Sequence, residues 1–220
     1  MTAPERAVAG PPIPEPILTG RIVAIARGIA AERLPAVAAA LRGGGVRAFE
    51  VTLDSPGALD GIAAVAAAEA AAGASGLLVG AGTVLDAGAA AALEAGARFL
   101  VMPHTDPDLV AWAAERGVAT FPGAMTPSEI LAAWRAGAAA VKLFPAVTLG
   151  PSFVREVRGP LGAIPLVPTG GITVANAAEF LAAGAAAVGV GGWLTGSGDP
   201  RLVGERASAL VAAIADGGRG

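Results

Sequence analysis

The chain has 220 residues, a formal net charge of −3, no cysteine, no tyrosine and a single histidine, His104. This composition excludes disulfides, thiol catalysis and a zinc site built from histidine and cysteine, and the scattered arginines form no basic stripe for nucleic acid. Because no apolar run is long enough to span a membrane and residues 1–6 show no secretory signal, we predict a cytoplasmic protein without a membrane partner.

Short apolar runs alternate along the chain with alanine-rich runs that are typical of helices. Residues 1–17, rich in proline and glycine, are predicted to form an N-terminal arm, and 18–220 a single domain. The predicted strands are 21–26, 46–51, 76–81, 98–102, 118–121, 140–144, 164–168 and 187–190. Near-continuous apolar strands separated by helices are typical of parallel sheets that are covered on both faces.

Helix boundaries agree with this pattern. Ser55–Pro56 and Thr126–Glu129 each place a capping residue before a proline, and the second segment has the capping-box sequence. Five glycines are predicted to end helices: Gly73, Gly96, Gly117, Gly137 and Gly184. Eight strand–helix units predict an α/β protein with a single (β/α)8 TIM barrel. The alternative is a doubly wound open sheet, but no G-x-G-x-x-G sequence follows the first strand.

The unusual residues of the chain fall at the carboxyl ends of the predicted strands, where active sites of such barrels lie. We therefore take as candidate substrate-binding residues, in chain order, Arg27, Thr52, Thr83, Pro103, Phe144, Thr169, Gly170, Gly171, Gly191 and Gly192. Glu50 and Lys142, which lie in two of the predicted strands, are the candidate catalytic residues.

Lys142 is the only lysine, since the other fourteen cationic side chains are arginines, and it lies in the apolar run 138–146. Arginine stays charged when it is desolvated, whereas lysine can lose its proton. A neutral amine is a nucleophile that forms a Schiff base with a ketone. The alternative is a surface lysine that extends its amine to water, but the apolar flanks offer it no polar face.

Glu50 lies in an apolar strand, as Lys142 does. Burial raises the pKa of a carboxyl group and a nearby cation lowers it, so a glutamate under both influences suits proton transfer. The alternative is a structural salt bridge to Arg27 or Arg47 at the rim of the barrel.

Glycine pairs follow the last two strands, at Gly170–Gly171 and Gly191–Gly192. Glycine lets backbone amides approach a ligand closely, and the loops after strands seven and eight of such barrels frequently bind phosphate. A plain tight turn would explain one such pair, but two adjacent pairs favour a phosphate site.

Five segments together resemble one family, the class I aldolases acting on 2-keto-3-deoxy-6-phosphogluconate (KDPG) and 4-hydroxy-2-oxoglutarate (KHG). The segments are Phe49–Leu53, Gly80–Leu85, Phe121–Glu129, Val141–Ala146 and Pro168–Ile172. The resemblance implies a cytoplasmic homotrimeric lyase of carbohydrate metabolism, of the Entner–Doudoroff type. It also implies cleavage of a phosphorylated keto acid to pyruvate and an aldehyde, without a metal or organic cofactor.

The resemblance further implies a role for each candidate group. Lys142 would form the Schiff base, Glu50 would be the general acid and base, working partly through water, and Thr83 would hold the keto-acid carboxylate. The residues at 169–171 and 191–192 would bind the far end of the substrate, including its phosphate.

The sequence departs from the family at two positions. Asp54 stands where relatives often carry an arginine that meets a carboxylate, and we hypothesise that Arg27 supplies the missing cation. The segments around Arg27 and Asp54 resemble the phosphogalactonate branch, so a 2-dehydro-3-deoxy-6-phosphogalactonate aldolase is the alternative. Gly192 stands where relatives often have a phosphate-binding serine. A phosphate-binding isomerase or epimerase and a non-catalytic sugar-phosphate-binding barrel are also compatible with these residues.

Overall fold

The computed structural model of the chain describes residues 8–86 and 88–217. The strands are β1 (Ile22–Ala26), β2 (Ala48–Thr52), β3 (Leu78–Gly82), β4 (Phe99–Val101), β5 (Ala119–Phe121), β6 (Gly123–Ala124), β7 (Val141–Leu143), β8 (Leu166–Pro168) and β9 (Val188–Val190). The helices are α1 (Glu15–Gly20), α2 (Leu34–Gly43), α3 (Ala58–Ala71), α4 (Gly88–Glu94), α5 (Pro107–Ala114), α6 (Pro127–Arg135), α7 (Ala146–Leu161), α8 (Ala177–Ala182), α9 (Gly192–Thr195) and α10 (Pro200–Gly217). Short 3-10 turns lie at Ala31–Arg33 and Gly73–Ser75.

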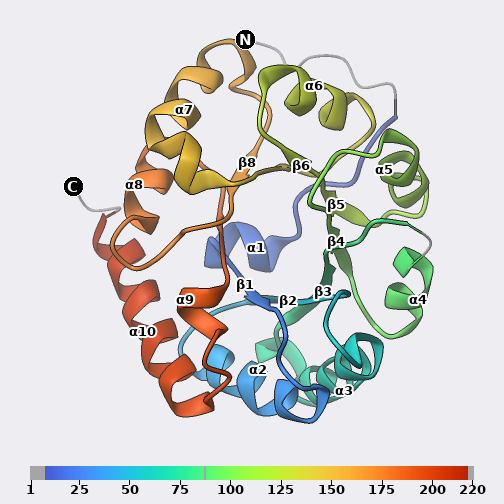
Figure 1. The fold of residues 1–220 in the computed structure, drawn as a ribbon, viewed down its shortest axis with the longest axis vertical. Helices are drawn as coiled ribbons and strands as arrows, with labels where there is room; N and C mark the ends of the chain where they lie inside the picture. Colours follow the sequence, from blue (N-terminus) through green and yellow to red (C-terminus); the bar gives the residue numbers. More distant parts are fainter. Residues whose placement is uncertain (1–7, 87, 218–220) are drawn as a thin grey trace.

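The strands form two curled parallel sheets, one in the order β5-β4-β3-β2-β1-β9 and one in the order β6-β7-β8. Most helices lie around the outside of the strands, with α1 near the centre of the view (Figure 1). Within each sheet the order follows the chain, apart from β9 beside β1, so it does not reverse as in a doubly wound sheet. The chain therefore has an α/β fold built on curled parallel sheets.

Each predicted strand overlaps an observed strand that is shorter than predicted, and β2 and β3 end one residue beyond the predicted ranges. The structure adds β6, which Pro122 alone separates from β5. Proline lacks the N–H that a continuous ladder would need, which explains the break at this point. At the other junction between the two sheets, an isolated parallel bridge joins Thr169, just after β8, to Gly189 of β9.

Residues of α1, β1, β2, β4, β5 and β8 form a packed apolar cluster. Phe99 and Phe121, at the start and end of their short strands, meet edge to face with ring centroids 5.8 Å apart. Ile13 and Ile17 belong to the same buried cluster. The predicted arm therefore includes packed residues and the start of α1, while its residues 1–7 lie outside the described part of the chain.

The predicted helix ends are largely confirmed. The five predicted C-cap glycines all have positive φ angles, from 60° to 111°. The hydroxyl of Thr126 accepts from the N–H of Glu129 at 3.3 Å, and the Glu129 carboxylate accepts from the N–H of Thr126 at 2.8 Å, which completes the capping box. No described helix is both long and apolar enough for a membrane span.

The predicted helix start at Ser55–Pro56 is wrong, because α3 begins at Ala58 after Gly57, whose φ is 68°. The Ser55 hydroxyl has another use: it accepts from the N–H of Gly28 at 2.8 Å. It thereby ties the loop after β2 to the loop after β1, and this tertiary contact outweighs the local capping preference.

Candidate active site

A cavity of about 770 Å³ lies at the carboxyl ends of the strands. Its walls contain every predicted site residue except Thr52, and they also include four residues that sequence reasoning did not select. The lining residues are Ile25, Arg27, Glu50, Thr83, Pro103, Lys142, Phe144, Thr169, Gly170, Gly171, Ile172, Thr173, Gly191, Gly192 and Trp193. The carboxyl ends of parallel strands lie at the same edge of a sheet. Residues that follow these ends therefore share one cavity although they are far apart in sequence.

Thr52 is placed differently from the prediction. Its side chain is fully buried, and its hydroxyl lies 2.9 Å from that of Ser55. It shapes the loop after β2 and does not line the cavity.

The lining residues that the prediction missed are Ile25, Ile172, Thr173 and Trp193. Three of them closely follow predicted glycines, and that proximity was the available signal. Ile25 carried no signal, since it reads as an ordinary apolar strand residue. His104 is exposed and does not line the cavity, as expected for a loop residue.

Lys142 is the central residue of β7, between Gly123 of β6 and Val167 of β8. It is only 6% exposed. Burial lowers the pKa of its ammonium, the Glu50 carboxylate acts in the opposite direction, and the Arg27 cation lowers it further. The Lys142 Nζ lies 4.9 Å from the centre of the Phe144 ring. These surroundings favour the neutral, nucleophilic amine.

Glu50 is the central residue of β2 and is 1% exposed. Burial raises its pKa from the ordinary 4.5 to about 7, although the charges of Lys142 and Arg27 both act to lower it. A Cβ at Gly82 would lie 2.4 Å from Glu50 Oε1, so glycine at this position makes room for the carboxylate. Both protonation states of Glu50 are thus accessible near neutral pH, as a general acid and base requires.

The carboxylate of Glu50 has spare hydrogen-bonding capacity. Within residues 8–86 and 88–217, its Oε2 atom is buried and has no hydrogen-bond partner. Among the described residues, the alternative salt bridges from Glu50 to Arg27 or Arg47 do not form: Arg27 pairs with Asp54, and Arg47 donates to the carbonyl of Val46 at 3.3 Å. A buried polar atom without a protein partner points to a ligand or water as its partner.

A second, small cavity of about 10 Å³ is bounded by Glu50, Lys142 and Thr169 together with apolar strand residues. A space of this size holds about one water molecule, and polar groups on its wall suit a water. The two candidate catalytic groups thus share a place for a bridging water.

Arg27 and Thr83, on the wall of the cavity, form a hydrogen-bonded set with Asp54, which does not line it. Arg27 Nη1 donates to an Asp54 carboxylate oxygen, and Arg27 Nη2 donates to Thr83 Oγ1 at 2.8 Å. Thr83 has a φ of 53°, which is uncommon for a β-branched residue and is typical of functional sites.

The glycine loops, at Gly170–Gly171 and Gly191–Gly192, also line the cavity. Gly170 and Gly171 have φ angles of 95° and 75°, and a Cβ at Gly171 would lie 2.5 Å from Val147 Cβ. Among the described residues, the N–H groups of Gly171 and Ile172 donate to no acceptor. A Cβ at Gly192 would meet no atom within 4 Å, so the missing serine leaves open space. These amides are free to bind an anionic group.

Metal ligands do not gather in this structure: in the described part of the chain no three histidine or acidic side chains lie together in a way that could hold a metal ion. The chemistry that these residues themselves offer is that of an amine nucleophile, a proton-transferring carboxyl group and anion-binding amides.

The chain is similar to proteins of known name. A family model described as KDPG and KHG aldolase matches residues 13–201. The chain is 38% identical over 208 residues to a probable 2-dehydro-3-deoxy-6-phosphogalactonate aldolase of Rhizobium meliloti, covering 91% of this chain and 94% of that protein.

Solved structures are similar as well. The structure of native KDPGal superposes with a TM-score of 0.85 at 30% identity, covering 90% of this chain and 96% of that one. A KDPG aldolase from Legionella pneumophila, solved with pyruvate captured as a covalent carbinolamine intermediate, has a TM-score of 0.76 at 25% identity, covering 91% and 95% of the two chains.

Proposed function

This chain belongs to the KDPG and KHG aldolase family, and we propose that it is a class I aldolase that cleaves a 2-keto-3-deoxy-6-phospho-sugar acid. The products would be pyruvate and glyceraldehyde 3-phosphate, and 4-hydroxy-2-oxoglutarate would be a further substrate, giving pyruvate and glyoxylate. One observation carries the proposal: a desolvated lysine and a buried glutamate, one of whose oxygens has no partner in the described part of the chain, line the same cavity.

The proposed fold is a closed (β/α)8 barrel. Two contacts support closure of the two sheets into one: the bridge between Thr169 and Gly189, and the continuation of β5 into β6 across Pro122. A closed barrel would join the sheet that carries Glu50 to the sheet that carries Lys142 and hold both residues rigidly.

The proposed first step is formation of an imine. The neutral amine of Lys142 attacks the C2 ketone of the substrate, and Glu50, protonated near its pKa of about 7, gives a proton to the carbinolamine oxygen. Water leaves and an iminium forms. Covalent catalysis of this kind divides one difficult step into easier ones.

The proposed second step breaks the C3–C4 bond. Glu50, now a carboxylate, takes the proton of the C4 hydroxyl directly or through a water, and the bonding electrons flow into the iminium. The aldehyde leaves, the enamine is protonated at C3, and water hydrolyses the resulting imine to pyruvate and free Lys142. All proton transfers are thus assigned to Lys142, Glu50 and water.

The two ends of the substrate would lie at different parts of the lining. Thr83 and Arg27 offer a hydroxyl and a cation to the keto-acid carboxylate. The amides of Gly171 and Ile172, with the Gly191–Gly192 loop, offer donors to the phosphate. Because Gly192 brings no hydroxyl, backbone amides would do most of the phosphate binding here.

The second candidate substrate is the galactonate epimer. It is favoured by the 38% identity to a probable 2-dehydro-3-deoxy-6-phosphogalactonate aldolase and by the contact between Arg27 and Asp54, two residues whose segments resemble that branch. Comparing kcat/KM for the two C4 epimers decides between them. A higher value for the gluconate epimer would contradict the galactonate assignment.

The experiment that tests the proposed function is borohydride reduction in saturating pyruvate. We expect one carboxyethyl group on Lys142, which lies between Arg135 and Arg155 in the chain's tryptic map. Trypsin cuts after an unmodified lysine, so the 142–143 bond would stay uncut in the adduct. Lys142→Arg is the matched control and should remain unmodified.

An unchanged mass for the folded wild-type protein would contradict the covalent step and favour an isomerase or epimerase. An adduct without aldehyde release from any of the substrates would indicate the non-catalytic sugar-phosphate-binding protein. The homotrimer, the cytoplasmic location and the Entner–Doudoroff role stay predictions, and the first of them is checked by light scattering.

A further inference from the structure

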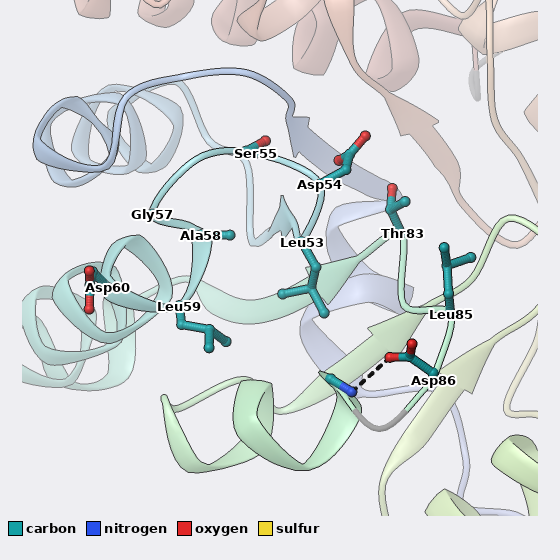
Figure 2. Close-up of a pocket in the computed structure, with 11 residues that line it drawn as sticks. Leu53, Asp54, Ser55, Gly57, Ala58, Leu59, Asp60, Thr83, Leu85 and Asp86 are labelled. Carbon is teal, nitrogen blue, oxygen red and sulfur yellow. Dashed lines mark hydrogen bonds between the residues drawn. The ribbon is translucent and has the colours of Figure 1, made fainter.

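Asp54 belongs to a group of acidic residues beside the active site, and its carboxylate pairs with Arg27 of the catalytic cavity. It lines a neighbouring cavity of about 620 Å³ together with Asp60 and Asp86, and Thr83 lies in the walls of both cavities. Figure 2 shows the side chains of Asp54 and Thr83 on two adjacent loops, those after β2 and β3.

The guanidinium of Arg27 is held at two of its nitrogens. Nη1 donates to Asp54 and Nη2 donates to Thr83 Oγ1. A guanidinium has five N–H donors in a planar fork, so three of them remain for a ligand. Since the Arg27 side chain is 56% exposed, these contacts, and not burial, define where it lies.

The hydrogen bond from Arg27 also determines what Thr83 can do. Thr83 Oγ1 accepts from Nη2, and its own hydroxyl proton is therefore directed elsewhere. Its backbone, at a φ of 53°, holds the side chain on the wall of the catalytic cavity. Arg27 and Thr83 thus present several donors to one side of the cavity, which suits a carboxylate.

From this geometry we propose that Asp54 is a positioning residue, which fixes Arg27 against Thr83 so that the two together bind the carboxylate of the keto acid. The inference rests on the proposed function and deepens it, since it names the residue that organises one substrate subsite. Without Asp54, an exposed arginine side chain would keep only the Thr83 contact and would spend much of its time in solvent.

The electrostatics of the site provide an independent readout. The charged groups acting on Glu50 are Lys142 and Arg27, and both lower its pKa against the effect of burial. If Arg27 leaves the cavity wall, one of these influences is lost and the pKa of Glu50 rises. If Arg27 stays and only the negative charge of Asp54 is lost, the pKa of Glu50 falls.

The experiment measures the pyruvate concentration that half-saturates borohydride trapping, in the wild type and in Asp54→Ala, Asp54→Asn and Asp60→Asn. We expect about a tenfold increase for Asp54→Ala, the size of one charge-assisted hydrogen bond. Asp54→Asn keeps an acceptor for Arg27 and should lie in between. Asp60→Asn removes the same charge from the same cavity wall, away from Arg27, and should match the wild type.

A double-mutant cycle shows whether Asp54 acts through Arg27. Adding Asp54→Ala to Arg27→Ala should cause no further increase, because the residue that Asp54 positions is gone. The pH midpoint of trapping should move upward in Asp54→Ala and stay in place in Asp60→Asn. Equal thermal unfolding midpoints for the single variants would show that the fold is intact.

Three results would overturn the inference: an unchanged or lower half-saturating concentration in Asp54→Ala, a downward move of the pH midpoint, or a full effect of Asp54→Ala in the Arg27→Ala background. Failure of the proposed function looks different, because the wild type would then form no adduct at all.

Discussion

Two buried glutamates of this chain, Glu69 and Glu50, have opposite surroundings. Glu69, on α3, is 4% exposed, and its Oε2 accepts from Arg42 Nη1 at 3.0 Å and from the N–H of Leu77 at 2.8 Å. Glu50, on β2, is 1% exposed, and its Oε2 has no partner among the described residues. The first carboxylate joins α3 to the start of β3 and to α2, whereas the second faces a cavity.

The difference shows how a buried charge can serve structure or chemistry. A buried carboxylate whose oxygens are bonded by the protein is stabilising because its partners replace water. A buried carboxylate that keeps a free oxygen costs folding free energy, and it is available to bond a substrate or a water. The second kind keeps the spare acceptor that proton transfer requires.

Glu50 can serve the proposed chemistry only if the amine of Lys142 forms an imine. Lys142→Arg keeps the positive charge but cannot form an imine, so we expect turnover to fall by about 10³-fold or more. Steady-state assay of pyruvate release checks this. Lys142→Met, similar in length and uncharged, separates loss of the amine from strain of the larger guanidinium. Activity near that of the wild type in both variants would refute the Schiff-base role.

Glu50→Gln tests the functional member of the pair. The amide keeps the shape of the side chain but cannot exchange a proton, so we expect kcat to fall by about 10²–10⁴-fold. The unfolding free energy should stay the same or increase, because a buried charge is removed. A variant that loses stability but keeps kcat would make Glu50 structural, like Glu69.

The pH dependence of stability sharpens the same contrast. Burial raises the pKa of Glu50 in the folded protein from 4.5 to about 7. The stability that its protonated form contributes is thus complete below pH 4.5 and is lost as the pH rises through about 7, a loss of about 3 kcal/mol. Lys142, whose pKa is lowered in the folded protein, acts in the opposite sense. The stability that its neutral amine contributes to the protein is lost as the pH falls through the folded pKa of Lys142.

Urea unfolding of the wild type and Glu50→Gln between about pH 5 and pH 8.5 isolates the Glu50 contribution. The stability of the wild type relative to Glu50→Gln should fall from pH 5 to about pH 7 and level off above it. A difference that does not vary with pH would show that the pKa of Glu50 is not raised.

Glu69→Gln tests the structural member. Loss of the charge weakens the bonds to Arg42 and to the N–H of Leu77, so we expect a loss of about 1–3 kcal/mol in unfolding free energy. Since Arg42 is partly exposed, water replaces some of its lost contact. Chemical denaturation measures the loss, and borohydride trapping by pyruvate should be unchanged. Impaired trapping would link Glu69 to the active site and end the contrast.

Much of the fold was predictable from the sequence. Apolar runs of β-branched residues located the strands, and the glycines at helix ends and the Thr126 capping box are local signals that tertiary structure preserved. The predictions that failed are those that depended on contacts between distant loops. Ser55 has the sequence position of a helix cap but is bonded to Gly28, and Thr52, whose hydroxyl lies 2.9 Å from that of Ser55, does not line the cavity.

The sequence by itself determined the inventory of reactive groups: one lysine in an apolar run, one glutamate in another, and glycine pairs after two late strands. It could not decide which carboxylates would be bonded, because Glu50 and Glu69 each lie among apolar neighbours. Tertiary structure alone brought Arg42 and Leu77 to Glu69, left Oε2 of Glu50 without a partner among the described residues, and placed Asp54 against Arg27. Hydrogen bonds act over about 3 Å, and which groups come that close depends on how the strands and loops pack.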